Sequence, residues 1–295
     1  MVRLTKKEED KDVITPVDTI WYLAYGSNMD PNVLTEWRKI QPIESKKVVV
    51  PEYWLSFDFN GVPFMEPCFA SVLKKDLSRI HDKNYAQFVH DRCCYGQEFV
   101  WNQDHPEKSY PPTLQGVAHK ITLREWTLII QSECGWGHYV PTSYKHIEVN
   151  CSGIDLNENI PAQILVARPT AIRTRCQPSL RYKNILVAGA AHHGLDPIYQ
   201  DYLMKIIPYA CTGLRSKVAK SVFFIFNIPI VIAFALLIRV NKGRPADQHV
   251  QPPFWMVWYF DKASRFSNTA HDFIVEAKLP KSPELAAKAI EIVAV

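Results

Sequence analysis

The chain has 295 residues, of which 47% are hydrophobic and 22% are charged, and its formal net charge is +4. This balance excludes a wholly disordered chain, because disordered chains lack the apolar residues needed to build a core. Lys and Arg are spread along the sequence and form no basic stripe, so the sequence does not predict nucleic-acid binding. The composition therefore predicts one large globular domain, or one domain with extensions.

Cysteine use and the opening residues indicate a reducing compartment. The seven cysteines are an odd number without a CxxC pair, and the opening residues MVRLTKKEEDKDVITP are charged where a signal peptide would be apolar. We therefore expect a cytoplasmic protein. The vicinal pair Cys93–Cys94 is most simply a pair of inert thiols, with redox or metal chemistry as the alternative.

After a polar lead-in over residues 1–19, the segment WYLAYGSNM (21–29) predicts a strand that ends in a tight turn. Apolar and aromatic residues run directly into Gly26, Ser27 and Asn28, and an Asp-Pro helix start follows. Such a turn leaves backbone N–H groups that can bind a carboxylate or an oxyanion. An ordinary turn in which Asn28 or Asp30 caps the next helix also explains the pattern.

Several further elements follow in chain order. Stretches rich in β-branched and aromatic residues predict strands at 46–61 and 67–75. Residues 76–112 are polar and aromatic with little periodicity, which indicates an insertion or a long surface excursion. Alternating patterns then predict three more strands, at 114–122, 138–150 and 160–170. Helical patterns predict one helix at 123–134 and two more within 181–207.

The C-terminal extension, residues 216–295, contains a long apolar run. Residues 222–238, VFFIFNIPIVIAFALLI, carry no charge. This length is near the lower limit of the roughly 17–25 residues that span a membrane. Asn227 and Pro229 weaken that interpretation, so a buried helix or helix pair packed on the domain is the alternative. The sequence leaves membrane association through this run open.

Glu133 ends the predicted helix at 123–134, in LIIQSECGWG. A carboxylate that follows an apolar helix and is partly buried is a candidate general acid or base, whereas a solvated glutamate at a helix end is the simpler alternative. A hydrolase using Ser27 with His192 or His193 would lack the Gly-x-Ser-x-Gly elbow. The histidines show no metal-ligand spacing, so we expect neither a metal nor a cofactor.

Three ordered blocks resemble the γ-glutamyl cyclotransferase family. The first is YLAYGSNM at 22–29, and the second is GVAHKITLREWTLIIQSE at 116–133, a Gly-Val strand followed by a helix that ends in the family's catalytic Glu. The third is SLRYKNILVAGAAHHGLDPIYQDYLMKI at 179–206. The resemblance covers 20–215. The long 76–112 excursion and the extra C-terminal residues are similar to a fungal branch exemplified by the cyclotransferase of gliotoxin-type biosynthetic clusters.

The resemblance implies an α+β fold, a small mixed β-barrel with flanking helices, followed here by a helical, apolar C-terminal extension. It also implies release of 5-oxoproline from a γ-glutamyl substrate, a small molecule. The turn from Tyr25 to Asn28 would hold the γ-glutamyl group, and Glu133 would transfer the proton. By position, Tyr139 and Tyr182 match tyrosines that line the family's pocket.

A second class of function stays open beside the enzyme. A non-catalytic barrel protein could bind a ligand and be tethered to a membrane or a partner through residues 222–238. Glu133 discriminates between the two, because a binding protein has little need for a carboxylate at that spacing from the Tyr-Gly-Ser-Asn turn.

Overall fold

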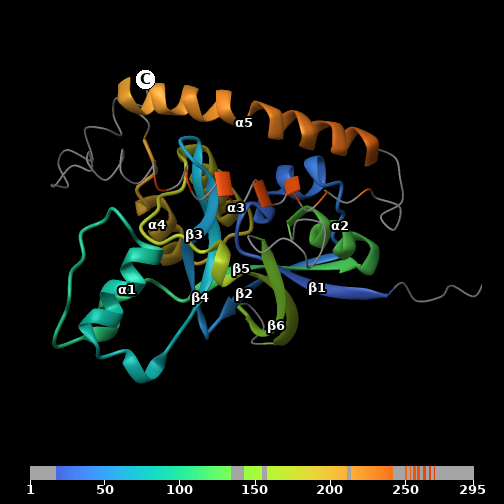
Figure 1. Ribbon diagram of the computed structural model, residues 1–295. Helices are drawn as coiled ribbons and strands as arrows, with labels where there is room; N and C mark the ends of the chain where they lie inside the picture. Colours follow the sequence, from blue (N-terminus) through green and yellow to red (C-terminus); the bar gives the residue numbers. More distant parts are fainter. Residues whose placement is uncertain are drawn as a thin grey trace, which may run out of the picture.

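A closed barrel of five strands forms the centre of the fold in the computed structural model (Figure 1). The structure describes residues 18–133, 143–154, 158–210 and 214–241, with scattered positions between 250 and 269. The barrel strands, in spatial order, are β1 (Thr19–Ala24), β5 (Leu114–Thr122), β2 (Glu44–Val50), β6 (Tyr144–Gly153) and β7 (Asn159–Ala167).

The barrel is mixed, because β1 pairs antiparallel with β5 but parallel with β7, and this last pairing closes it. Alternate residues of each strand point into the barrel, and the apolar side chains among them form its core. Leu23, Val117, Ile121 and Ile164 are fully buried. The α+β class with a small mixed barrel and flanking helices is therefore confirmed.

The stretch 46–61 contributes to two different sheets. Its first part belongs to β2 of the barrel, and its second part belongs to β3 (Tyr53–Val62), which pairs antiparallel with β4 (Glu66–Lys74). Pro51 and Glu52 form the turn between the two parts. Proline has no backbone N–H to give to a ladder, so the strand run is divided there.

Four of the helices lie where helical patterns or the apolar run predicted them: α2 (Leu123–Glu133), α3 (Leu180–His192), α4 (Pro197–Lys205) and α5 (Leu214–Asn241). The shorter helical turns are η1 (Ser27–Met29), η2 (Asn32–Trp37, with π-type hydrogen bonds), η3 (Leu77–Arg79), η4 (Pro106–Ser109) and η5 (Pro169–Ala171). Helix α2 thus ends at Glu133, as the sequence pattern predicts.

Helix α1 (Lys83–Cys93) lies within the 76–112 segment, where the sequence predicted no helix. Asp82 caps it by accepting a hydrogen bond from the Asn84 backbone N–H at 2.8 Å. The helix buries Tyr85 and Val89 against Trp54, in a small second core. Most residues between the ends of α1 are polar, so the apolar periodicity of its sequence is weak. Packing against β3 determines where the helix lies.

The vicinal thiols lie at the end of α1, and Cys93 is buried. Burial raises the pKa of Cys94 to about 12 and raises that of Cys93 well above the usual value. Since the thiolate is the reactive form, both thiols are protonated near neutral pH and chemically inert. This environment favours the first of the two alternatives.

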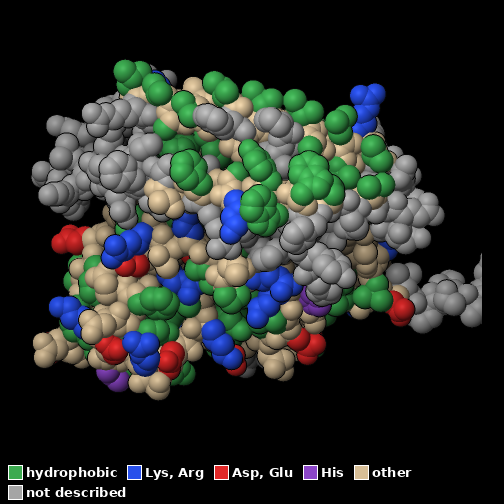
Figure 2. Space-filling model, viewed as in Figure 1, with side chains coloured by type: hydrophobic (Ala, Val, Ile, Leu, Met, Phe, Trp, Pro, Cys, Tyr) green, Lys and Arg blue, Asp and Glu red, His purple; other side chains and the backbone are tan. Residues whose placement is uncertain are grey.

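Helix α5 contains residues 222–238 and lies along one side of the molecule, outside the barrel (Figure 1). Its Phe223 ring contacts Phe64, with ring centroids 6.3 Å apart. Figure 2 shows hydrophobic side chains along the outer side of this helix, and Ile225, Ile232 and Leu236 are exposed. Nowhere in the described part of the chain is a helix both long enough and apolar enough to cross a membrane.

Candidate active site

A cavity of about 370 Å³ opens where β1 ends. This volume falls in the range of small-molecule sites. Its wall combines residues that are far apart in the sequence. They come from β1 and the turn after it, the η2 segment, β3, β4, α2, β6, β7 and α3. These include Tyr22, Tyr25, Gly26, Ser27, Asn28, Arg38, Phe59, Phe69, Ala70, Ser132, Glu133, Tyr144, Arg181 and Tyr182.

The turn after β1 is held by its own backbone. The Met29 N–H donates to Gly26 O at 3.1 Å, and the Asp30 N–H donates to Ser27 O at 3.0 Å. Asp30 then accepts from the Asn32 backbone N–H at 2.8 Å, so Asp30 supports the start of η2. A Cβ at Gly26 would lie 3.0 Å from the Tyr182 hydroxyl, closer than an ordinary van der Waals contact, so a larger residue there would crowd that hydroxyl.

Helix α3 supports the turn from behind. A Cβ at Gly189 would lie 2.8 Å from the Asp30 nitrogen, so the helix backbone packs directly on the turn. The His193 Nε2–H donates to Met29 O at 3.1 Å. His193 is therefore engaged with the backbone of the turn, which gives no support to a hydrolase that uses it with Ser27.

Buried His119 lies beside His193, with ring centroids 5.7 Å apart. Its Nδ1 is 2.8 Å from the Ser45 hydroxyl oxygen. Burial, with a smaller contribution from His193, lowers the pKa of His119 to about 3. The ring is therefore neutral at physiological pH, and it packs behind the turn as an uncharged group.

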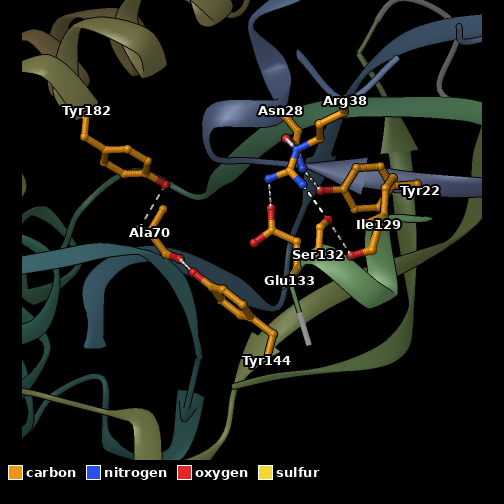
Figure 3. A network of polar contacts seen from close by, with 9 residues as sticks. All are labelled: Tyr22, Asn28, Arg38, Ala70, Ile129, Ser132, Glu133, Tyr144 and Tyr182. Carbon is orange, nitrogen blue, oxygen red and sulfur yellow. Dashed lines mark hydrogen bonds and ion pairs between the residues drawn. The ribbon is translucent and has the colours of Figure 1, made fainter. Parts of the chain in front are cut away.

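Asn28 connects two other side chains of the site (Figure 3). Its Nδ2 donates to the Tyr22 hydroxyl at 2.8 Å, and its Oδ1 accepts from Arg38 Nε at 2.7 Å. Both ends of the amide are thus engaged within the protein. Asn28 orients Arg38, which follows η2, toward the end of α2.

Glu133 and Arg38 form an ion pair at the cavity wall, and each side chain is 21% exposed. Arg38 Nη1 also donates to the Ser132 hydroxyl at 2.5 Å. The Glu133 carboxylate points into the space between Arg38 and the tyrosines (Figure 3). The predicted partial burial of Glu133 is therefore observed, and its partner, Arg38, lies 95 positions earlier in the sequence.

Three tyrosines face this carboxylate. The Tyr25 hydroxyl donates to Leu165 O at 2.5 Å, and the Tyr144 hydroxyl donates to Ala70 O at 2.6 Å. The Tyr182 oxygen instead accepts from the Ala70 N–H at 3.2 Å. Burial raises the pKa of all three, and the nearby Glu133 charge adds to this, so they stay neutral and can act as hydrogen-bond donors.

Of the residues expected at the site, the structure brings together Glu133, Tyr182 and the Tyr25–Asn28 turn. Tyr139 lies outside the described residues. Arg38 and Tyr144 also line the site, and no sequence pattern predicted either of them. The only sequence feature that could indicate Arg38 is its position in the segment after the turn. For Tyr144 the sequence predicts a strand and nothing about the site.

The chemistry available to this cavity is acid–base chemistry. It offers the Glu133 carboxylate, the guanidinium groups of Arg38 and Arg181, and neutral hydroxyl groups around a partly shielded space. Within residues 18–133 and the other described ranges, no group of three or more His, Cys, Asp or Glu side chains is placed to hold a metal ion. A carboxylate beside neutral donors can take up a proton and return it while a new oxyanion is stabilised.

Comparison with known proteins identifies the family. No family model matches the chain. Gamma-glutamyl cyclotransferase gliK of Aspergillus fumigatus is 31% identical over 82% of this chain and 81% of its own length. Gamma-glutamyl cyclotransferase aclK of Aspergillus oryzae is 31% identical over 84% of this chain and 83% of its own.

Among solved structures, a gamma-glutamyl cyclotransferase aligns at 17% identity over 66% of this chain and 92% of that chain. Its TM-score of 0.42 is too low to add to the assignment. The two Aspergillus relatives suffice, because their similarity extends over most of both chains. The protein described here belongs to the γ-glutamyl cyclotransferase family.

Proposed function

We propose that this chain releases 5-oxoproline from a γ-glutamyl amino acid or a glutathione-derived conjugate, with Glu133 as the general acid and base. The observation that carries the proposal is the Glu133 carboxylate, which is partly buried in a cavity beside the Tyr25–Asn28 turn. A base in that position lies next to any ligand that the turn holds.

The reaction needs one proton carrier. Glu133 takes a proton from the substrate α-ammonium, and the freed amine attacks the γ-carbonyl carbon of the same glutamyl unit. A new C–N bond closes the five-membered lactam, and the old γ-amide C–N bond breaks. The protonated Glu133 then returns its proton to the departing amine. The new ring nitrogen gives up its second proton by the same route, so the departing group leaves as the ammonium of an amino acid or a peptide remnant.

Such a reaction suits a sparse site. The nucleophile is part of the substrate, so holding the chain folded supplies much of the rate enhancement. Proton transfer by a positioned side chain contributes typically about 10²–10⁴-fold. Stabilisation of the oxyanion that forms on the γ-carbonyl oxygen contributes a further part.

We infer that Tyr182 donates a hydrogen bond to that oxyanion. Its oxygen accepts a hydrogen bond from the Ala70 N–H and also takes part in a hydrogen bond with the Ser27 backbone, again as the acceptor. Its own proton can therefore be given to a ligand in the cavity. Tyr144 differs, because it already donates its proton to Ala70 O.

We therefore expect Tyr182→Phe to lower kcat by about 10²-fold, the effect of removing one oxyanion donor. Tyr144→Phe is the matched control: it removes a buried hydroxyl from the same cavity and should lower kcat much less. Steady-state kinetics and thermal unfolding of both variants test this difference. An equal loss of kcat in two equally stable variants would contradict the role of Tyr182.

The metabolic setting that we propose is fungal sulfur-containing secondary metabolism of the gliotoxin type. The enzyme would trim γ-glutamyl groups after glutathione has delivered sulfur to a scaffold. Two observations support this setting: the resemblance to the fungal branch, and relatives from fungi named gamma-glutamyl cyclotransferase gliK, aclK and verK.

A substrate panel tests the proposed function. Purified protein is incubated with γ-glutamyl amino acids, glutathione and a glutathione S-conjugate, and 5-oxoproline is measured by mass spectrometry. We expect 5-oxoproline from at least one substrate, and the fastest of them defines the substrate class. If none yields 5-oxoproline, the chain is better explained as a barrel protein that binds a ligand without catalysis.

A further inference from the structure

The guanidinium of Arg38 is held on three sides at the cavity wall. Nε donates to Asn28 Oδ1 at 2.7 Å, Nη1 donates to Ser132 Oγ at 2.5 Å, and Nη2 pairs with the Glu133 carboxylate (Figure 3). Asn28 and Ser132 fix the plane of the guanidinium. The structure thus places a fixed cation and a carboxylate side by side, facing the same cavity.

This pair is complementary to an amino-acid zwitterion. A γ-glutamyl group carries an ammonium and a carboxylate on the same α-carbon. It can enter by exchange of partners: its carboxylate replaces Glu133 on Arg38, while its ammonium binds Glu133. Every charge then keeps an opposite partner, which avoids the costly state of an unpaired charge in a shielded site.

Arginine is suited to this exchange. Its planar guanidinium binds a carboxylate through two parallel N–H···O bonds, and it stays charged at all relevant pH values. We propose that Arg38 binds the α-carboxylate of the γ-glutamyl substrate and so restricts the reaction to γ-glutamyl groups whose α-carboxyl group is free. This inference rests on the proposed function, because it names the substrate feature that the same site recognises.

A second arginine at the cavity, Arg181, is less suited to the role. Its side chain is 58% exposed, and its guanidinium is paired with Glu66 at 2.5 Å. Glu66 also accepts a hydrogen bond from the Ser179 hydroxyl at 3.1 Å, and it is not part of the cavity wall. The charge of Arg181 is thus neutralised by a group that does not take part in the exchange.

The test compares two substrates that differ only at the α-carboxyl group. One is a γ-glutamyl amino acid with a free α-carboxylate, and the other is the same molecule as its α-carboxamide. Release of the amino acid by each is followed in the full-length wild type and in Arg38→Gln. Arg124→Gln, which changes an exposed arginine on α2, is the control.

We expect the wild type and the control to prefer the carboxylate by at least about 10-fold in kcat/KM, the order expected for hydrogen bonds to a charged group. In Arg38→Gln the preference should fall to a few-fold. Arg38→Lys keeps the charge but not the planar fork, so we expect an intermediate preference. It also serves as the second variant if Arg38→Gln fails to fold.

A variant that loses activity equally on both substrates, with the preference intact, would overturn the inference, because Arg38 would then only hold Glu133 in place. Such a result would leave the proposed function standing, since the wild type would still form the lactam. If the wild type releases amino acid from neither substrate, the proposed function fails, and the inference fails with it.

Discussion

Glu133→Gln should lower the rate of 5-oxoproline formation by at least about 10²-fold, while the fold stays intact. Glutamine keeps the size and shape of the side chain, but it cannot take the proton from the substrate α-ammonium or give one to the departing amine. A positioned general acid or base contributes about 10²–10⁴-fold to such reactions. Glu133 lies at the end of α2, and the amide oxygen of a glutamine there can still accept a hydrogen bond from Arg38, so we expect the fold to be kept.

The measurement is kcat for 5-oxoproline release under saturating substrate, with circular dichroism and thermal unfolding to verify the fold. Glu36→Gln provides a matched control, because Glu36 is an exposed glutamate two residues before Arg38 and its side chain pairs only weakly with Lys39 at 3.9 Å. The control should retain wild-type activity. A Glu133→Gln variant as active as the wild type would exclude Glu133 as the proton carrier and leave the family assignment unchanged.

Elements with strong periodicity could be predicted from the sequence. Strand β5 has the bounds that its pattern predicts, and helix α2 begins at the predicted residue, because β5 lies within the barrel core and α2 packs Ile129 against it. Helix α1 could not be predicted in this way. Its exposed residues include Phe88 beside polar ones, so the sequence shows no clear apolar face, and only the tertiary contact with Trp54 shows which residues are buried.

The site shows the same division. The turn after β1 and Glu133 are local features, since each ends a regular element, and the family resemblance drew attention to both. The ion pair between Arg38 and Glu133 joins residues 95 positions apart. No local pattern reports such a contact. The two directions of hydrogen bonding at Ala70, which distinguish Tyr144 from Tyr182, also depend on the closed barrel and its neighbouring sheet.

Asp58→Ala should lower the free energy of unfolding by about 3–5 kcal/mol, which is a large loss for a single substitution. Asp58 lies on β3 and is fully buried, and it pairs with the nearly buried Arg92 of α1. Ser56 Oγ donates to the same carboxylate at 3.0 Å. Alanine would leave the Arg92 cation buried without its partner, and this uncompensated charge causes most of the loss.

Chemical unfolding of the wild type and the variant measures the difference, with Glu52→Ala as the control. Glu52, in the turn just before β3, pairs with Lys74 of β4 at 3.5 Å, but both side chains are 68% exposed, so this substitution should leave stability nearly unchanged. The double variant Asp58→Leu, Arg92→Met removes both charges and should recover most of the loss. If the double variant is as unstable as Asp58→Ala, the unpaired charge is not the cause, and α1 depends on the hydrogen bonds of Asp58 instead.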